Sequence, residues 1–155
     1  MAKQNAPVRA VVDTNLIVSG LLKKPGIPYQ LVEAFRKGHF TLVLSPPLLA
    51  EYRQVLHRPK LQEKYALTEA EIAAFFFLIE TNAHLVTPQP RLPVKIRDQR
   101  DEGVLAAALG GQADYLVSGD QDLLVLKNDP GLSGLRIVTA KEFLSLLAEE
   151  QRTPG

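Results

Sequence analysis

Acidic side chains follow two of the short apolar runs of this chain. Asp13 ends the run VRAVV, and Asp120 ends ADYLVSGD, where it follows Ser118 and Gly119. A charge is costly to bury without a partner, so a carboxylate beside a core segment needs a hydrogen-bond donor or a cation. Both positions have a second explanation, because Asp is also a preferred residue at the start of a helix, where it caps backbone N–H groups.

Further acidic positions lie within helical patterns. Glu51 falls at the border of the apolar stripe in SPPLLAEYRQVLHR, where a Glu can also reach solvent or pair with a base such as Arg53. In RDQRDEGVLAAAL, Asp101 and Glu102 open an Ala/Leu-rich helix, whose N-terminus favours negative charge. Because these two are adjacent, only one of them can point at a shared site. Helix-start chemistry is sufficient to explain Asp98.

Several carboxylates in one site repel one another and raise one another's pKa unless a cation neutralises them. The chain has no cysteine, and its three histidines stand far apart, so oxygen ligands and a hard ion, Mg²⁺ or Mn²⁺, are indicated rather than zinc. Such an ion activates a water and offsets charge at a phosphate. The residue types therefore indicate metal-assisted phosphodiester hydrolysis, provided that the acids meet in space: Asp13, Glu51, Asp101 or Glu102, and Asp120.

Alternating elements must bring these acids together. Strands are predicted at 9–12, 40–44, 84–86, 115–117 and 136–138, and helices at about 27–37, 46–57, 68–82, 101–110 and 141–149. Strands separated by helices favour an α/β fold, a three-layer α/β/α sandwich with a mostly parallel central sheet. In open sheets of this kind, sites form outside the carboxyl ends of the strands. The Pro-containing segments LKKPGIP and VTPQPRLPVK are predicted loops.

The length and composition predict one domain over residues 1–155. Its core would span about residues 8–147, between short flexible ends, residues 1–7 and the tail EEQRTPG. The absence of cysteine fits a reducing cytoplasm, and the longest apolar run, IAAFFFLI, is too short to span a bilayer. The start MAKQNAPVRA lacks the apolar core of a signal peptide. We therefore expect a cytoplasmic protein with no membrane partner, and its net charge of +1 requires a local patch for any anionic partner.

Taken together, the four acidic segments resemble the PIN-domain family of metal-dependent ribonucleases. VVDTNLIVSGLL is similar to the first motif of the family, with Asp13 and its polar follower Asn15, and LLAEYRQVL is similar to the second, with Glu51. RDEGVLAAAL and ADYLVSGDQDLL are similar to the third and fourth motifs. The resemblance runs from about residue 9 to residue 138, and it is closest to VapC-like toxins of toxin–antitoxin pairs.

The resemblance implies an Mg²⁺- or Mn²⁺-dependent endoribonuclease, the toxin of a bacterial or archaeal type II pair, which a small antitoxin inhibits by blocking the acidic cleft. The family often carries two Asp, or Asp and Asn, in its third motif, where this chain has Asp101 and Glu102. We favour Asp101 as the metal ligand, with Glu102 as a helper or substitute. Ser118, Asp122 and Asn15 are implied as groups that orient ligands or water.

A carboxylate site that binds RNA also needs basic side chains at its rim. Arg53, Arg97 and Arg100 are the candidates nearest to the acids in sequence, although ordinary surface charge explains most basic residues. The segment EIAAFFFLIE is apolar nearly all round a helix. It is either a buried core helix or partly an interface with a second copy, and a homodimer or higher oligomer would fit the resemblance.

Two other functions remain open. The departure at Glu102 is compatible with a catalytically weak or inactive PIN-like module that binds RNA or serves as a scaffold. A phosphorylated-Asp enzyme is disfavoured, because a haloacid-dehalogenase-type phosphatase would need a second Asp where Asn15 stands.

Overall fold

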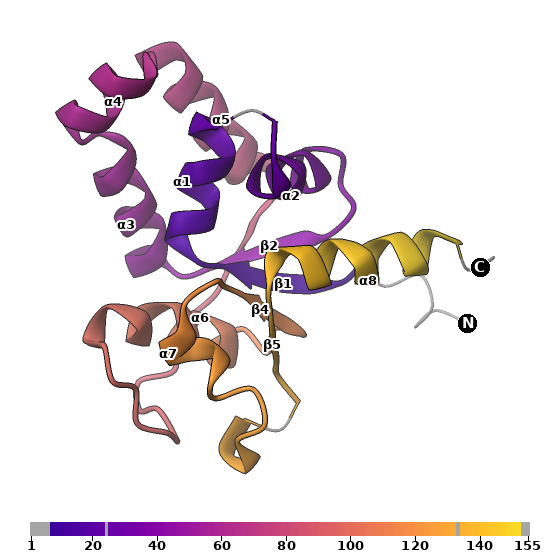
Figure 1. Ribbon diagram of the computed structural model, residues 1–155. Helices are drawn as coiled ribbons and strands as arrows, with labels where there is room; N and C mark the ends of the chain where they lie inside the picture. Colours follow the sequence, from indigo (N-terminus) through magenta and orange to yellow (C-terminus); the bar gives the residue numbers. More distant parts are fainter. Residues whose placement is uncertain (1–6, 24, 133, 153–155) are drawn as a thin grey trace.

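A computed structural model describes residues 7–23, 25–132 and 134–152 of the chain (Figure 1). Its strands form a five-stranded sheet in the order β3-β2-β1-β4-β5, and every pair of neighbours is parallel. The strands are β1 (Arg9–Val12), β2 (Thr41–Leu44), β3 (His84–Leu85), β4 (Tyr115–Val117) and β5 (Arg136–Val138).

Helices cover both faces of this sheet. Figure 1 shows the first five helices on one side of the strands, and α6 and α7 on the other, while α8 contacts α2. The α-helices are α1 (Thr14–Leu22), α2 (Ile27–Arg36), α3 (Pro46–Leu56), α4 (Pro59–Tyr65), α5 (Glu69–Asn82), α6 (Glu102–Gly110), α7 (Gln121–Leu124) and α8 (Ala140–Arg152), with 3₁₀ turns η2 (Gln99–Asp101) and η3 (Pro130–Leu132). The predicted three-layer α/β/α class is confirmed, with an entirely parallel sheet.

The apolar side chains of the strands and helices form one buried cluster. The central strands β1 and β2 are buried almost throughout, as expected for strands with helices on both faces. In α5 the core takes Phe75 and Phe76, whereas Phe77 is 67% exposed. None of the helices in the described ranges is long and apolar enough to cross a membrane.

Some predicted boundaries were wrong for physical reasons. Helix α4 was not predicted, and the structure shows why its residues lack an apolar period, because none of them is fully buried. Pro28 falls both in the predicted loop LKKPGIP and in the helix predicted at 27–37, and it lies in the first turn of α2, where its fixed φ is compatible with a helix. Residues 150–152, predicted only as part of a loose tail, continue α8. The rest of the two predicted flexible ends, residues 1–6 and 153–155, lies outside the described residues.

The strand order has a switch point between β1 and β4. From β1 the chain moves outward to β2 and β3, then crosses back to β4 and continues to β5 on the other side. The connections that leave β1 and β4 therefore diverge, and open α/β sheets bind ligands in the crevice expected at the carboxyl edge of such a point. The parallel register pairs Val12 with Val117, so the residues that follow the two strands stand side by side at this crevice.

Candidate metal centre

Asp13 is the first acid at this crevice. It directly follows β1, is 7% exposed, and its Oδ2 accepts a hydrogen bond of 2.7 Å from the Ser118 hydroxyl. Although it precedes α1, its side chain makes no capping hydrogen bond to that helix. Burial raises the pKa of Asp13, the Ser118 hydroxyl opposes this shift, and the charges of Asp120 and Glu51 raise the pKa further. Asp13 is therefore more than a helix cap, because it shares its surroundings with two other acids.

Asp120 follows β4 and keeps the helix-capping role that the sequence allowed. Its Oδ1 accepts a hydrogen bond of 2.8 Å from the Asp122 backbone N–H at the start of α7. Its own N–H donates to the Ser118 hydroxyl oxygen at 3.0 Å. Ser118 thus links the Asp120 backbone to the Asp13 carboxylate through its hydroxyl.

Asp101 reaches the crevice from the other layer. It ends the 3₁₀ turn η2 directly before α6 and is 6% exposed. Burial, followed by the charges of Asp120, Asp13 and Asp98, raises its pKa to about 7. Its Oδ2 is buried and has no hydrogen-bond partner among the described residues. A buried carboxylate oxygen without a donor is rare in folded proteins and indicates that an ion or water completes the site.

Glu51 approaches from α3. Its Oε2 accepts a hydrogen bond from the Thr14 hydroxyl, and its charge raises the pKa of Asp13. The alternative pairing with Arg53 does not occur, because Arg53 pairs with Glu80 at 3.3 Å and lies over the Phe76 ring. Glu51 is half-buried, and its interactions are with the Thr14 hydroxyl and the charge of Asp13.

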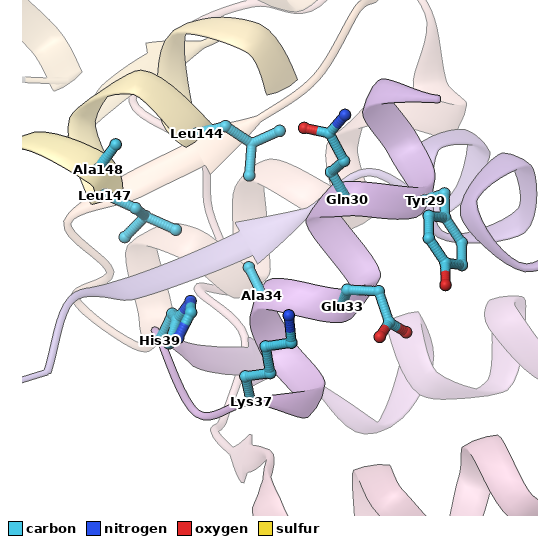
Figure 2. A pocket seen from close by; sticks show the side chains of 9 residues that line it. All are labelled: Tyr29, Gln30, Glu33, Ala34, Lys37, His39, Leu144, Leu147 and Ala148. Carbon is cyan, nitrogen blue, oxygen red and sulfur yellow. The ribbon is translucent and has the colours of Figure 1, made fainter. Parts of the chain in front are cut away.

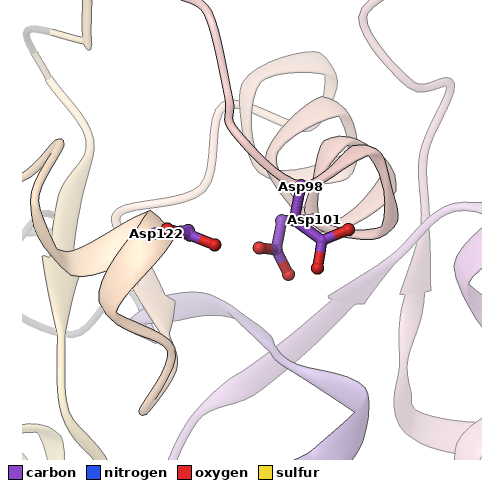
Figure 3. Close-up of side chains that lie close together, drawn as sticks. All are labelled: Asp98, Asp101 and Asp122. Carbon is purple, nitrogen blue, oxygen red and sulfur yellow. The ribbon is translucent and has the colours of Figure 1, made fainter.

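Two more acids complete the cluster. Carboxylate oxygens of Asp98, Asp101 and Asp122 lie within 4.8 Å of one another, and Figure 3 shows Asp122 on α7 opposite the other two. Asp98 does cap η2, as predicted, by accepting the Arg100 N–H at 3.0 Å. Its second place, in the cluster, was not predicted from the sequence. The spacing of three residues between Asp98 and Asp101 was a usable signal, because it places two side chains on one side of a helical turn.

The other predicted site residues lie outside the acidic cluster or at its rim. Glu102 and Asn15 are exposed, and Asp101 rather than Glu102 belongs to the cluster. Arg100 donates to Asp98 at 2.8 Å, and Arg97 lies 3.9 Å from Asp122, so both stand at the rim of the acids. Arg53 is directed to α5 instead.

A groove elsewhere on the molecule involves none of the predicted site residues. It has a volume of about 380 Å³ and lies between α2 and α8, with His39 at one end (Figure 2). Leu144, Leu147 and Ala148 of α8 form its apolar side. The acids therefore gather at a place set apart from this groove.

The donor set fits a hard divalent cation. The cluster contains only carboxylate oxygens, one of them buried without a donor among the described residues. Burial raises the pKa values of Asp13 and Asp101, and the charges of neighbouring acids raise them further. Mg²⁺ and Mn²⁺ prefer such oxygen ligands and would remove the repulsion. The cluster could therefore bind metal.

Comparison with known proteins agrees with this geometry. The family model described as PIN domain matches residues 9–122, which include all of these acids. The uncharacterized protein MJ1680 of Methanocaldococcus jannaschii is 26% identical over 142 residues, which cover 88% of this chain and 90% of the relative. No solved structure matches. Since the family model spans most of its length, the chain belongs to the PIN domain family.

Proposed function

We propose that the protein is an Mg²⁺- or Mn²⁺-dependent endoribonuclease and the toxin of a type II toxin–antitoxin pair. PIN domains are generally nucleases that use divalent metals, and this chain belongs to that family. The observation that carries the proposal is that Asp120, Asp13 and Asp98 raise the pKa of Asp101, whose buried Oδ2 has no donor among the described residues. Glu51 joins this set through its effect on the pKa of Asp13. Asp13, Glu51, Asp101 and Asp120 would hold the cation, with Asp98 and Asp122 beside them.

A bound cation would supply a Lewis acid that activates water and offsets negative charge on the scissile phosphate. The chain itself would do the positioning. Ser118 holds Asp13 and the Asp120 backbone in a fixed relation, so two ligands are oriented before a substrate arrives. Asp101, with a pKa of about 7, can hold a proton in the metal-free protein and release it when positive charge enters.

Arg97 and Arg100 would bind the RNA backbone. Both side chains are 88% exposed, and their partners Asp122 and Asp98 belong to the acidic cluster. Exposed ion pairs of this kind are weak, so the guanidinium groups can exchange their carboxylates for phosphate oxygens. Arg53, held against Glu80 and Phe76, lies outside this proposal.

The central test is RNA cleavage by the purified protein with Mn²⁺, with Mg²⁺ and with EDTA. We expect cleavage with either ion, none with EDTA, and a loss of about 100-fold or more in Asp13→Asn. Asp114→Asn is the matched control, because Asp114 precedes β4 at the opposite edge of the sheet and accepts the Arg9 N–H, which an Asn oxygen also can do. This control should cleave at the wild-type rate.

The outcomes separate the alternatives. Cleavage that persists in EDTA, or in Asp13→Asn at the wild-type rate, would contradict the metal mechanism. Binding of Mn²⁺ without cleavage of any structured or single-stranded RNA would favour the inactive RNA-binding or scaffold module instead.

The toxin role has a separate test in cells. Induced expression should arrest bacterial growth, Asp13→Asn should not, and co-expression of a small open reading frame beside the gene should relieve the arrest. Growth at the normal rate by cells that contain active ribonuclease would contradict the toxin role while leaving the ribonuclease proposal intact. The predicted cytoplasmic location remains a prediction.

A further inference from the structure

Two consecutive residues of α3 are hydrogen-bonded to both flanks of Asp13. The Tyr52 hydroxyl donates to the Val12 carbonyl at 2.5 Å, and the Thr14 hydroxyl donates to the Glu51 carboxylate. The segment that carries Asp13 is thus tied to the helix that carries Glu51 at two points. Neither bond involves Asp13 itself.

Both hydroxyls are shielded from water. Tyr52 is 0% exposed and Thr14 is 4% exposed. The register pairs of β1 with β2 end at Ala10 and Leu42, so the Val12 carbonyl lies beyond them and is bonded by Tyr52 instead. Hydrogen bonds in such surroundings are stronger than in water, and their loss leaves a partner without a donor.

The Thr14 bond differs from the Tyr52 bond in what it controls. The Tyr52 hydroxyl ties the Val12 backbone to α3. The Thr14 hydroxyl instead holds the carboxylate of Glu51, a side chain with several rotatable bonds. A β-branched side chain in a helix has few χ1 rotamers, so the Thr14 hydroxyl is a stiff donor. Its bond uses only Oε2 of Glu51, and the Glu51 charge raises the pKa of Asp13 nearby.

We propose that Thr14 is a positioning residue, which holds the Glu51 carboxylate toward the cluster and thereby sets the affinity of the protein for a divalent cation. This inference rests on the proposed metal centre and gives a role to a residue for which the sequence analysis assigned none. Hydrogen-bond partners of ligating carboxylates commonly contribute a factor of about 10 to 100 in metal affinity.

The test measures Mn²⁺ binding to the full chain without RNA. Binding is monitored by titration calorimetry or by the electron paramagnetic resonance signal of the free ion. Thr14→Val, which removes the hydroxyl and keeps the branched shape, should weaken binding about 10-fold or more. Thr14→Ser, which restores a hydroxyl, should recover most of the affinity. Thr81→Val is the matched control, because the Thr81 hydroxyl donates to the Phe77 carbonyl within α5, away from the acids.

A double-mutant cycle with Glu51→Gln distinguishes positioning from a general effect on the fold. If Thr14 acts through Glu51, Thr14→Val should change Mn²⁺ affinity much less in the Glu51→Gln background than in the wild type. The inference would be overturned if Thr14→Val changed Mn²⁺ affinity equally in both backgrounds, or if Thr14→Val bound Mn²⁺ with wild-type affinity. It would also be overturned if Thr14→Ser bound Mn²⁺ as weakly as Thr14→Val. Wild-type protein that binds no Mn²⁺ would contradict the metal centre itself, whereas loss of binding in Asp13→Asn but not in Thr14→Val would contradict only the role of Thr14.

Discussion

At the scale of single residues, the acids of the crevice are held in surroundings that disfavour their charge. Burial is the largest cause of the raised pKa of both Asp13 and Asp101, and neighbouring carboxylates add to it. Without a cation, each of these groups is more easily protonated in the folded chain than in the unfolded one. The metal-free fold is therefore less stable than the same fold without these charges.

Asp101 makes the stability of the metal-free protein depend on pH. Its folded pKa of about 7 lies above the ordinary value of 3.8, so between these values the folded chain holds a proton that the unfolded chain has lost. The contribution of Asp101 to stability is fully present below pH 4 and is lost as the pH rises to 7. In EDTA, Asp101→Asn should therefore become progressively more stable than the wild type across this window, by on the order of a few kcal/mol at most. Urea unfolding at several pH values measures the difference, and a difference independent of pH would contradict the assignment.

Asp13→Asn should separate stability from function. The Asn side chain can still accept the Ser118 hydroxyl, while the charge repelled by Asp120 and Glu51 is gone. We expect the metal-free variant to melt at the same temperature as the wild type or higher, and to gain little from added Mn²⁺, which should stabilise the wild type by mass action. Calorimetric melting with EDTA and with Mn²⁺ tests both parts. A variant that melts well below the wild type in EDTA would show that the carboxylate supports the fold.

At the scale of elements, close packing of α6 helps to place the turn that carries Asp101. A Cβ on Gly110 would lie 2.0 Å from the Thr87 carbonyl oxygen and 2.7 Å from the Gln89 nitrogen, both in the loop that leads toward η2. A Cβ on Gly103, in the same helix, would meet no atom within 4 Å. The end of α6 therefore packs directly on backbone, and its beginning does not.

This contrast predicts opposite effects of one substitution at two sites. Gly110→Ala should destabilise the protein by about 2 kcal/mol or more, because backbone atoms must move. Gly103→Ala should stabilise it by about 0.5–1 kcal/mol, because Ala is the better helix former and has room. Urea unfolding in EDTA measures both, and two changes of the same sign would contradict the packing argument.

The elements also show which parts of the fold the pattern of residues could predict. Strands β1, β4 and β5 are predicted residue by residue, because buried strands in parallel sheets are short, β-branched apolar runs. Helix α4 was not predicted, because none of its residues is fully buried, and α1 was considered only as the helix that Asp13 would cap. The loop LKKPGIP and the helix predicted at 27–37 overlap at Pro28, and the structure assigns it to the first turn of the helix, where proline is tolerated.

At the scale of the whole molecule, α5 presents one large apolar side chain to solvent. Phe77 is 67% exposed, although Phe75 and Phe76 beside it are buried. The sequence left open whether this helix is wholly internal, and the structure shows that the core takes two of the three rings. Self-association through the third remains a proposal that the family resemblance suggests.

Phe77→Asp tests that proposal with little risk to the fold, because the side chain is exposed. We expect the wild type to sediment as a dimer or larger species, and the variant to shift toward the monomer, because a charge replaces apolar contact area. Phe77→Leu should keep the wild-type mass. Equal sedimentation of the wild type and Phe77→Asp would show that this ring takes no part in assembly.

The sequence by itself determined the acids, their oxygen-only chemistry and their places at strand ends and helix starts, because residue type and local periodicity are written in the chain. Only the tertiary structure decided which acids meet. The order β3-β2-β1-β4-β5 makes β1 and β4 neighbours, which brings Asp13 and Ser118 together from positions 105 residues apart. The tertiary structure also placed Asp98 and Asp122 beside Asp101 and left Glu102 exposed. The direction of a side chain at a helix start depends on packing that local sequence does not specify.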